Sequence, residues 1–459
     1  MDIREASHLE DTLSRAERFF DAHDVEIVRL EWCDLHGVSR GKHVSRGHFL
    51  TALETGATFS SAALQMDLQG EAYLLPGESA SPSWASLIGR PDPETLQPSF
   101  IEPRAARCLV DLYTADGRPE PASPRYALQR VVEEGRSMGL EASIGIELEF
   151  YLLRFSDGAI GSGMDGSLPA DRQVYRMQSS AEERGFLDAL HRQMSAAGVG
   201  VEAYCAEDGP GQFEIILQHG PAVAMADAAF TARNLIKEQA ARQGLLATFL
   251  SRPLASYSGS GAHVHQSLRT LSGEPVIPSE EQRDQSPFWR YLDGQLAAFK
   301  DASAFYLPTI NAYKRIALRP PAPIRIDWAY EDRSAAIRLL RGANGSLRLE
   351  NRAIAGEANP YLSVAASLAA GLEGVRNPAP LPDFSKRLHF GPDQPMSPTG
   401  EPIPASLSAA LDHLSASAVM RRWLGPQLVD LFLMLKRAEV RRYETAITDW
   451  ELREYLNLL

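Results

Sequence analysis

Cysteine is scarce in this chain: only Cys33, Cys108 and Cys205 occur in 459 residues, and they lie far apart. An odd number of widely spaced cysteines provides neither a disulfide framework nor a CxxC metal site. No apolar run approaches the roughly 18 residues that a membrane-spanning helix needs. The charged, amphipathic start of the chain has no hydrophobic signal core. These absences predict a cytoplasmic protein with no membrane partner, and we expect an enzyme.

Positive charge is also in short supply. The chain has 46 Lys and Arg against 59 Asp and Glu, which gives a formal net charge of −13 at pH 7. A nucleic-acid partner is disfavoured, because no basic excess exists to release counterions from a phosphate backbone. The sequence contains no GxxxxGK[ST] loop, so any bound phosphates would be held by metals, arginine and histidine.

The hydrophobic pattern divides the chain into two parts. A new strand, turn and helix unit begins with ARCLVDLYTADGRPEPASPR, so we predict an N-terminal domain of residues 1–105 and a larger domain of residues 106–459. Two proline-rich stretches, 68–103 and 376–404, are typical of long surface loops. Apolar spacing at the helical period predicts helices over the following segments: 9–23, 125–138, 180–197, 223–243 and the tail from residue 405.

One candidate strand carries two glutamates on one face. In SIGIELEFYLL, the aliphatic residues Ile146 and Leu148 alternate with Gly145, Glu147 and Glu149, and the side chains of a strand alternate between its two faces. Two carboxylates about 7 Å apart repel by roughly 2 kcal/mol at an effective dielectric constant near 20. An enclosed face would therefore need a cation, whereas water would solvate the pair on an open face. The pair alone leaves both interpretations open.

Two further segments carry acids and histidines in related patterns. Glu207 and Glu214 flank a Gly-Pro-Gly turn that could fold them toward one point. In GSGAHVHQSL, His263, His265 and Ser267 occupy alternate positions of a candidate strand behind a flexible Gly-Ser turn. The structural alternatives are a loop with ordinary surface acids and a core histidine with satisfied hydrogen bonds.

Arginines complete the set of candidate functional residues. In SLRLENR, Arg348, Glu350 and Arg352 lie on the face opposite two leucines. NAYKR and DRSAAIRLLR add further fixed cations: Arg315, Arg333 and Arg338. Any one of these arginines is explained equally well as a solvated surface charge. Together, carboxylates that suit Mg²⁺ or Mn²⁺ and arginines that stabilise a transferring phosphoryl group fit a multi-metal phosphoryl-transfer site.

These segments occur in the order found in one enzyme family. The chain resembles the glutamine synthetase family, and particularly its glutamate–amine ligase members, through motifs spread over nearly its whole length: EWCDLHGVSRGK, GIELEF, EDGPGQFEI, GSGAHVHQSL, NAYKR, DRSAAIR, RLENR, EANPYL and WELREYL. The resemblance implies an α+β fold. It comprises a small N-terminal β-grasp domain and a catalytic domain with a curved antiparallel sheet flanked by helices. It also implies a homo-oligomer, a dodecamer of two hexameric rings with sites shared between subunits.

The resemblance implies ATP as a cofactor, L-glutamate as a substrate and two to three Mg²⁺ or Mn²⁺ ions per site. Members activate the γ-carboxylate of glutamate as γ-glutamyl phosphate, which an amine then attacks. Two sets of ligands follow by position. Glu149, Glu207 and Glu214 match the ligands of the metal on the glutamate side, and Glu147, His263 and Glu350 match those of the metal that bridges the ATP phosphates.

The remaining carried-over residues contact the substrates. Arg315 and Arg352 match the arginines on the glutamate carboxylate, and Gly259 lies in the loop that meets the glutamate amino group, where Ser258 replaces the family's Asn. For the phosphates and the nucleotide, the matching residues are Arg333, Arg338, His265 and Ser267, with Arg338 serving both.

Two positions depart from the pattern of ammonia-using members. Ser60, in GATFSSAALQMD, stands where those members carry an Asp, and Pro321, in NAYKRIALRPPAP, stands where they carry a Glu. Loss of two negative charges should remove most of the binding energy of an ammonium ion. A larger amine could compensate by burying apolar surface, at about 25 cal/mol per Å². The sequence therefore predicts an organic amine as second substrate, and an acid-depleted site favours a neutral alkyl, hydroxyalkyl or aromatic amine.

Three alternatives remain open. The chain could be an ordinary glutamine synthetase in which other residues replace the missing acids. HVH on a strand also resembles a binuclear zinc motif, so a metal-dependent amidohydrolase is a second alternative. The third is a catalytically silent relative that acts as a structural oligomer, although a scaffold has no physical need for clustered carboxylates.

Overall fold

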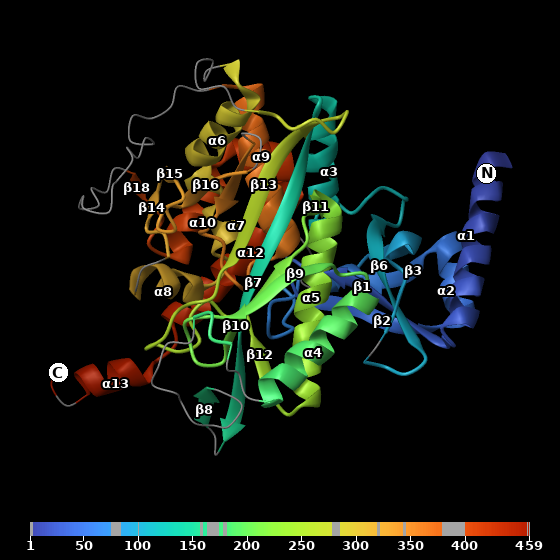
Figure 1. The fold of residues 1–459 in the computed structure, drawn as a ribbon, viewed down its shortest axis with the longest axis horizontal. Coiled ribbons are helices and arrows are strands. Elements are labelled where there is room, and N and C mark those ends of the chain that lie inside the picture. Colours follow the sequence, from blue (N-terminus) through green and yellow to red (C-terminus); the bar gives the residue numbers. More distant parts are fainter. Residues whose placement is uncertain are drawn as a thin grey trace.

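The protein is described by a computed structural model. It covers residues 3–74, 84–99, 101–156, 159–162, 174–177, 181–277, 285–318, 322–342, 346–378, 400–456 and 458. Pro321 and most of the proline-rich stretch 376–404 lie outside these residues. Two large sheets organise the described chain, one of six strands near the N-terminus and one of ten strands in the larger part (Figure 1).

The first sheet has the order β2-β1-β6-β4-β3, with β5 beside β6. Its strands are β1 (Ile27–Cys33), β2 (Ser39–Ser45), β3 (Ala57–Ser60), β4 (Ser86–Pro91), β5 (Gln97–Pro98) and β6 (Ala105–Thr114). Strands β1 and β6 are parallel, and the other pairs are antiparallel. Helix α2 (Arg46–Thr55) packs on this sheet and on α1 (Ile3–Ala22). The predicted β-grasp domain stays a prediction.

Two predictions from the sequence can be compared with this sheet. The interpretation of 68–103 as a surface loop is wrong for β4, which lies between β3 and β6 and buries Leu87. Six residues that include glycine and end in proline are too few to display a clear alternation. The predicted domain boundary at residue 105 coincides with the start of β6, whose pairing extends the first sheet to Thr114. A division between Thr114 and Pro124 would keep this sheet whole, and the boundary stays a prediction.

The larger sheet has the order β15-β16-β17-β13-β7-β10-β9, and β8, β11 and β12 also pair with β7. Its strands are β7 (Leu140–Ser156), β8 (Ala159–Ser162), β9 (Val201–Ala206), β10 (Gln212–Leu217), β11 (Gly220–Pro221), β12 (Leu246–Thr248), β13 (Ala262–Thr270), β15 (Trp328–Tyr330), β16 (Ile337–Arg341) and β17 (Leu347–Asn351). Strands β14 (Arg325–Ile326) and β18 (Glu401–Pro402) form a separate pair. The sheet is mixed and not purely antiparallel as predicted, because β15 and β16 run parallel. The chain reverses between them through Glu331, whose φ of 55° lies in the left-handed region.

Helices cover the aliphatic face of this sheet. Helices α3 (Pro124–Ser137) and α5 (Ala222–Arg242) pack against β7, and α9 (Pro360–Arg376) packs against both helices. The remaining helices are α4 (Ala181–Ala196), α6 (Pro287–Ala297), α7 (Phe299–Tyr306), α8 (Ile310–Leu318), α10 (Leu407–Ala416), α11 (Ala418–Leu424), α12 (Pro426–Glu444) and α13 (Asp449–Tyr455). The four predicted helices and the helical tail are therefore confirmed. None of the described helices is long and apolar enough to cross a membrane.

A network of four charged side chains joins the first sheet to the helices that cover the second. Arg125 of α3 donates to both carboxylate oxygens of Asp227 in α5 at 2.9 and 2.8 Å. The same guanidinium donates to Asp111 of β6 and to Asp92, which follows β4, both at 2.7 Å. Arg125 is buried. The first sheet is therefore anchored to the helical layer behind the second sheet.

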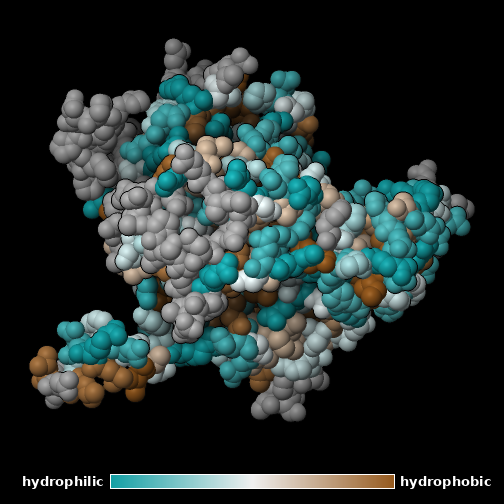
Figure 2. Space-filling view, turned by 60° about the horizontal axis from the view of Figure 1, so that its bottom comes forward, coloured by the Kyte–Doolittle hydropathy of each residue, from teal (hydrophilic) through white to brown (hydrophobic). Residues whose placement is uncertain are grey.

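The C-terminal helix α13 stands apart from this core. A capping box formed by Thr448 and Glu451 begins the helix, yet none of its residues is buried. It extends from the body at the lower left of Figure 1. Apolar side chains line its lower edge in Figure 2. The exposed apolar residues on α13 and directly beside it are Ile447, Trp450, Leu452, Tyr455, Leu456 and Leu458.

Candidate active site

Strand register brings the candidate residues together. Glu147 of β7 pairs with His263 of β13, and Glu149 pairs with Glu214 of β10. On the other side of β13, His265 pairs with Glu350 of β17. Four adjacent strands thus carry acids and histidines at neighbouring positions. The predicted alternation along β7 is confirmed, because the residues between the glutamates belong to the hydrophobic core.

A cavity of about 470 Å³ lies over this face of the sheet. Twelve of the predicted residues line it: Glu147, Glu149, Glu207, Glu214, Ser258, Gly259, His263, Arg315, Arg333, Arg338, Glu350 and Arg352. His265 and Ser267 line a neighbouring cavity of about 620 Å³, which shares Glu147 with the first. Ser60 is an exposed residue at the end of β3, where its hydroxyl accepts from the amide of Ala62 at 3.3 Å. It lines neither cavity within the described chain.

Donor atoms in the first cavity are close enough to share metal ions. The side chains of Glu147, His263 and Glu350 offer atoms within 4.8 Å of one another, which is the set predicted for one metal. Of the other predicted set, Glu214 groups with Glu149 and His263, and also with Glu207 and Cys205. The structure therefore brings both predicted sets to one wall of the cavity.

His263 shows that a divalent cation fits this arrangement. Its Nδ1 lies 3.1 Å from the Glu147 carboxylate and 3.6 Å from that of Glu350. Its buried Nε2 has no hydrogen-bond partner in the described structure and lies 3.6 Å from the Glu149 carboxylate. A buried ring nitrogen among carboxylates is a normal metal ligand, and hard oxygen ligands suit Mg²⁺ or Mn²⁺. The residues present thus fit the metals that the sequence predicts.

Burial and mutual repulsion perturb the acids of the cavity in opposite directions. Burial, reinforced by the carboxylates of Glu147 and Glu149, raises the pKa of Glu214 to about 9. Burial and the Glu149 carboxylate raise the pKa of Glu207 to about 7. Burial also acts on Glu147, but hydrogen bonds with His263 and His265 outweigh it and lower its pKa. On the Glu207 and Glu214 side of the cavity, the protonated carboxyl form is therefore favoured unless a cation compensates the ionised form.

We expect Mg²⁺ to raise the melting temperature of the protein more near pH 8.5 than near pH 6. Raised carboxyl pKa values stabilise the metal-free fold at acid pH, and that stability is lost as the pH rises through about 7 and 9. A metal must displace the protons of Glu207 and Glu214 at low pH but not at high pH. Thermal unfolding with EDTA or Mg²⁺ at both pH values measures the difference. Equal metal-induced shifts in wild type and in Glu214→Gln would contradict this account.

The arginines are held by backbone carbonyls and by the acids Glu350 and Glu331. Arg315 is buried and donates to the carbonyls of Ala353 and Arg352 at 3.3 and 3.2 Å. Arg352 donates to the Arg333 carbonyl at 2.8 Å and to the Glu350 carboxylate. Arg338 donates to the other oxygen of Glu350 at 3.2 Å. Backbone carbonyls orient Arg315 without neutralising its charge, whereas Arg338 and Arg352 are also paired with carboxylates.

Glycine is required in the loop beside these arginines. A Cβ atom at Gly259 would lie 2.5 Å from the Ser251 carbonyl oxygen and 2.7 Å from Cγ of Arg315. The neighbouring Ser258 donates from Oγ to the Asp208 carboxylate, and its carbonyl accepts from the Tyr151 hydroxyl at 2.6 Å. Ser258 is therefore engaged within the chain, on the rim of the cavity.

Sequence reasoning missed several residues of this cavity and its metal groups, among them Cys205, Tyr175 and Arg252. Cys205 lies on β9, two residues before Glu207 in the chain. Its Sγ is 3.8 Å from the Glu214 carboxylate. The strand period could have identified it, because alternate residues share a face. Tyr175 and Arg252 also line the cavity. No spacing signal points to them, because they come from irregular segments distant in sequence.

Comparison with known proteins agrees with this site. A sequence model described as the glutamine synthetase catalytic domain matches residues 121–455. The chain belongs to the glutamine synthetase family. A glutamate–isopropylamine ligase of a Pseudomonas species is 32% identical over 96% of this chain and 97% of its own. A glutamine synthetase of Methanococcus maripaludis is 31% identical over 97% of this chain and 99% of its own.

A solved structure extends the likeness to the fold. The structure titled "Apo GmaS without ligand" superposes with a TM-score of 0.81 at 29% identity, covering 95% of this chain and 98% of that one. The amidohydrolase alternative is excluded by membership of the glutamine synthetase family. Enzymes of this family use ATP and a divalent metal, in agreement with the donor groups in the cavity. Amine ligases and glutamine synthetases match at similar identity, so overall similarity does not select the acceptor.

Proposed function

We propose that this protein is an ATP-dependent glutamate–amine ligase. It activates the γ-carboxylate of L-glutamate as γ-glutamyl phosphate and couples it to an organic amine, giving a γ-glutamylamide, ADP and phosphate. The observation that carries the proposal is the single cavity in which both sets of metal-ligand candidates face four arginines. The 32%-identical isopropylamine ligase supports the amine acceptor.

The residues of the cavity have different proposed roles according to their charge. Arg315 and Arg352 bind the glutamate α-carboxylate, because their guanidinium groups are oriented by backbone carbonyls. Arg333 and Arg338 face the transferred phosphoryl group, where fixed cations stabilise the charge of the transition state. Glu147, His263 and Glu350 hold one divalent ion, and Glu149, Glu207 and Glu214 hold another. Divalent ions held by these residues would neutralise the charge of phosphate oxygens.

His265 and Ser267 orient the nucleotide. They extend the face of β13 beyond His263 into the neighbouring cavity. His265 is held by its Nε2, which lies 2.9 Å from the Glu147 carboxylate. Glu147 thus connects the metal group to the nucleotide side of the site.

The acceptor is inferred from Ser60 and Pro321. Both replace acids that the resemblance assigns to ammonium binding, and neither can hold a small cation by charge. Since Ser60 lies outside the cavity of its own chain, we place it at the site of a neighbouring copy in a ring-shaped homo-oligomer, a dodecamer of two hexamers. The exposed apolar side chains of α13 support such association.

ATP-dependent phosphate release with Mg²⁺ and glutamate tests the proposal. Ammonium is compared with alkyl, hydroxyalkyl, aryl and diamine acceptors. We expect the best organic amine to exceed ammonium in kcat/KM by at least about tenfold, a difference of roughly 1.4 kcal/mol. Preference for ammonium would indicate an ordinary glutamine synthetase. Absence of turnover with every acceptor would favour a catalytically silent relative that acts as a structural oligomer.

The variant Ser60→Asp makes the acceptor test specific. An added carboxylate should favour ammonium, so the ratio of ammonium to amine turnover should rise. Thr58→Asp is a matched control, because Thr58 is an exposed residue of the same strand. An unchanged ratio in Ser60→Asp would remove Ser60 from the acceptor site.

A further inference from the structure

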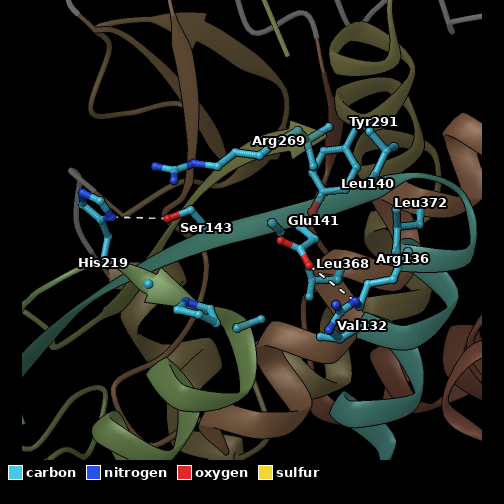
Figure 3. A pocket seen from close by; sticks show the side chains of 16 residues that line it. Val132, Arg136, Leu140, Glu141, Ser143, His219, Arg269, Tyr291, Leu368 and Leu372 are labelled. Carbon is cyan, nitrogen blue, oxygen red and sulfur yellow. Dashed lines mark hydrogen bonds and ion pairs between the residues drawn. The ribbon is translucent and has the colours of Figure 1, made fainter. Parts of the chain in front are cut away.

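A third cavity lies where β7 begins and β13 ends, next to the cavity that contains His265 and Ser267. It has a volume of about 370 Å³, within the range of about 300–1,000 Å³ that is usual for small-ligand sites. Its walls come from the start of β7, the end of α3, the first residues of α5, and parts of β13, α6 and α9 (Figure 3).

One end of this cavity is apolar. Leu140, Leu268, Leu368 and Leu372 line it and belong to the buried core, and Tyr291 closes it. The Tyr291 hydroxyl is engaged, because it donates to the Gln266 side chain at 2.6 Å. In Figure 3, Leu140, Leu368, Leu372 and Tyr291 gather on the right of the view. This end favours an apolar group such as an aromatic ring.

The opposite end carries positive charge. Arg269 of β13 extends above Ser143 and His219 in Figure 3, and no hydrogen bond or ion pair engages its guanidinium within the described residues. The Ser143 hydroxyl lies 3.3 Å from Nδ1 of His219. The one acid of the lining, Glu141, is paired with Arg136 at 3.4 Å. Arg269 is therefore an exposed cation at the mouth of an apolar cavity, opposite Glu141 in the strand register but not paired with its carboxylate.

We propose that this cavity binds an amphipathic organic acid, with its apolar body among the leucines and its carboxylate on Arg269. Arginine binds carboxylates through two parallel hydrogen bonds, which lysine or histidine cannot match. A neutral apolar molecule would leave Arg269 without a partner, and a fully polar anion would leave the leucine-lined end unfilled. A ligand that occupies both ends of the cavity must therefore carry an apolar body and a carboxylate.

The cavity is coupled to the nucleotide side through shared walls. Ser143, His219, Leu268 and Arg269 line both this cavity and the 620 Å³ cavity that contains His265 and Ser267. His219 and His265 lie on either side of Gly145, where a Cβ atom would be 3.6 Å from the Cβ of each. An acid bound at Arg269 therefore changes nucleotide affinity, and the site acts as a regulatory site. This coupling rests on the proposed function, whereas binding of the acid does not.

Calorimetric titration of the substrate-free protein tests the binding. The probes are phenylacetate and its neutral analogue phenylacetamide, which share the aromatic body and differ in charge. We expect phenylacetate to bind at least about tenfold more tightly, since a charge-assisted bidentate contact is lost in the amide. Equal affinity of the two probes, or no binding of phenylacetate at millimolar concentration, would overturn the proposal.

Two variants locate the binding in this cavity. Arg269→Gln should abolish the preference for the acid, and because Arg269 is exposed, the fold should tolerate the change. Leu372→Phe should fill the apolar end and weaken both probes. Arg118→Gln, at an exposed turn of the first sheet, serves as the control and should bind as wild type does. Binding that survives Arg269→Gln with its preference intact would overturn the assignment.

Titration with ADP and Mg²⁺ tests the coupling. A coupled site changes the affinity for ADP by the same factor by which ADP changes the affinity for phenylacetate. Independence of the two ligands would refute a regulatory role. Complete competitive displacement would show that the cavity belongs to the nucleotide site and would overturn a separate site. Because none of these titrations needs turnover, failure of the proposed ligase activity would leave the binding result standing.

Discussion

Replacing Glu149 with glutamine is expected to lower ATP-dependent phosphate release by roughly 10²- to 10³-fold, the effect typical of losing one group that stabilises developing charge. Glu149 Oε2 accepts from the amide of Gly261 at 2.8 Å. Glutamine can keep this bond through its side-chain carbonyl, so the loop before β13 should hold its place. The variant therefore removes a metal ligand while preserving the local fold.

Phosphate release and thermal unfolding, measured together, separate the two effects. The melting temperature of metal-free Glu149→Gln should equal or exceed that of wild type, because Glu207 and Glu214 lose a repulsive neighbour. Glu134→Gln is a control at an exposed glutamate of α3, which pairs with Arg376. A variant that keeps more than about a tenth of wild-type turnover would contradict the assignment of Glu149. A scaffold without ligase activity would show no turnover in either protein.

Replacing Arg125 with methionine should destabilise the protein by about 3–5 kcal/mol, the range for breaking a buried ion pair by removing one partner. Three carboxylates, those of Asp92, Asp111 and Asp227, would lose their shared cation. Among the described residues, Asp227 would keep the Tyr361 hydroxyl, which donates to it at 2.7 Å. Methionine fills a similar volume without the charge, so the loss is electrostatic and not a cavity effect.

Urea unfolding followed by circular dichroism measures this loss. Arg125→Lys should be intermediate, because an ammonium group cannot form the two parallel bonds to Asp227. Arg118→Met is the matched surface control, and its exposed pair with Asp116 should contribute nothing measurable. If Arg125→Met unfolded at the wild-type urea concentration, the network would have no role in anchoring the first sheet to helices α3 and α5.

Strand periodicity explains most of what could be predicted from the sequence. Glu147 and Glu149 share a face because side chains alternate along a strand, and His263 and His265 follow the same rule on β13. Once the strands pair, these residues must meet. The helices were predictable for a similar reason, since their apolar stripes repeat over several turns.

Contacts that depend on tertiary packing were beyond sequence reasoning. Arg125 binds Asp227, which lies 102 residues later in the chain, and no local sequence pattern indicates this contact. The parallel pairing of β15 with β16 was missed for the same reason, because it depends on how a short connection reverses. Cys205 was visible in principle, but its two-residue spacing from Glu207 carries meaning only when the segment is known to be a strand.

The terminal helix α13 has a consequence for handling the protein. Seven residues with none buried are too few to form a stable helix alone in water, where isolated helices shorter than about 12–15 residues are marginal. In the proposed ring, neighbouring copies supply the missing contacts, and Trp450, about half exposed in one chain at 56%, becomes an intrinsic fluorescence reporter of assembly. Dilution should shift its emission to longer wavelength and open the C-terminus to proteases while both sheets stay folded. An affinity tag is therefore better placed at the N-terminus, where it does not compete with assembly.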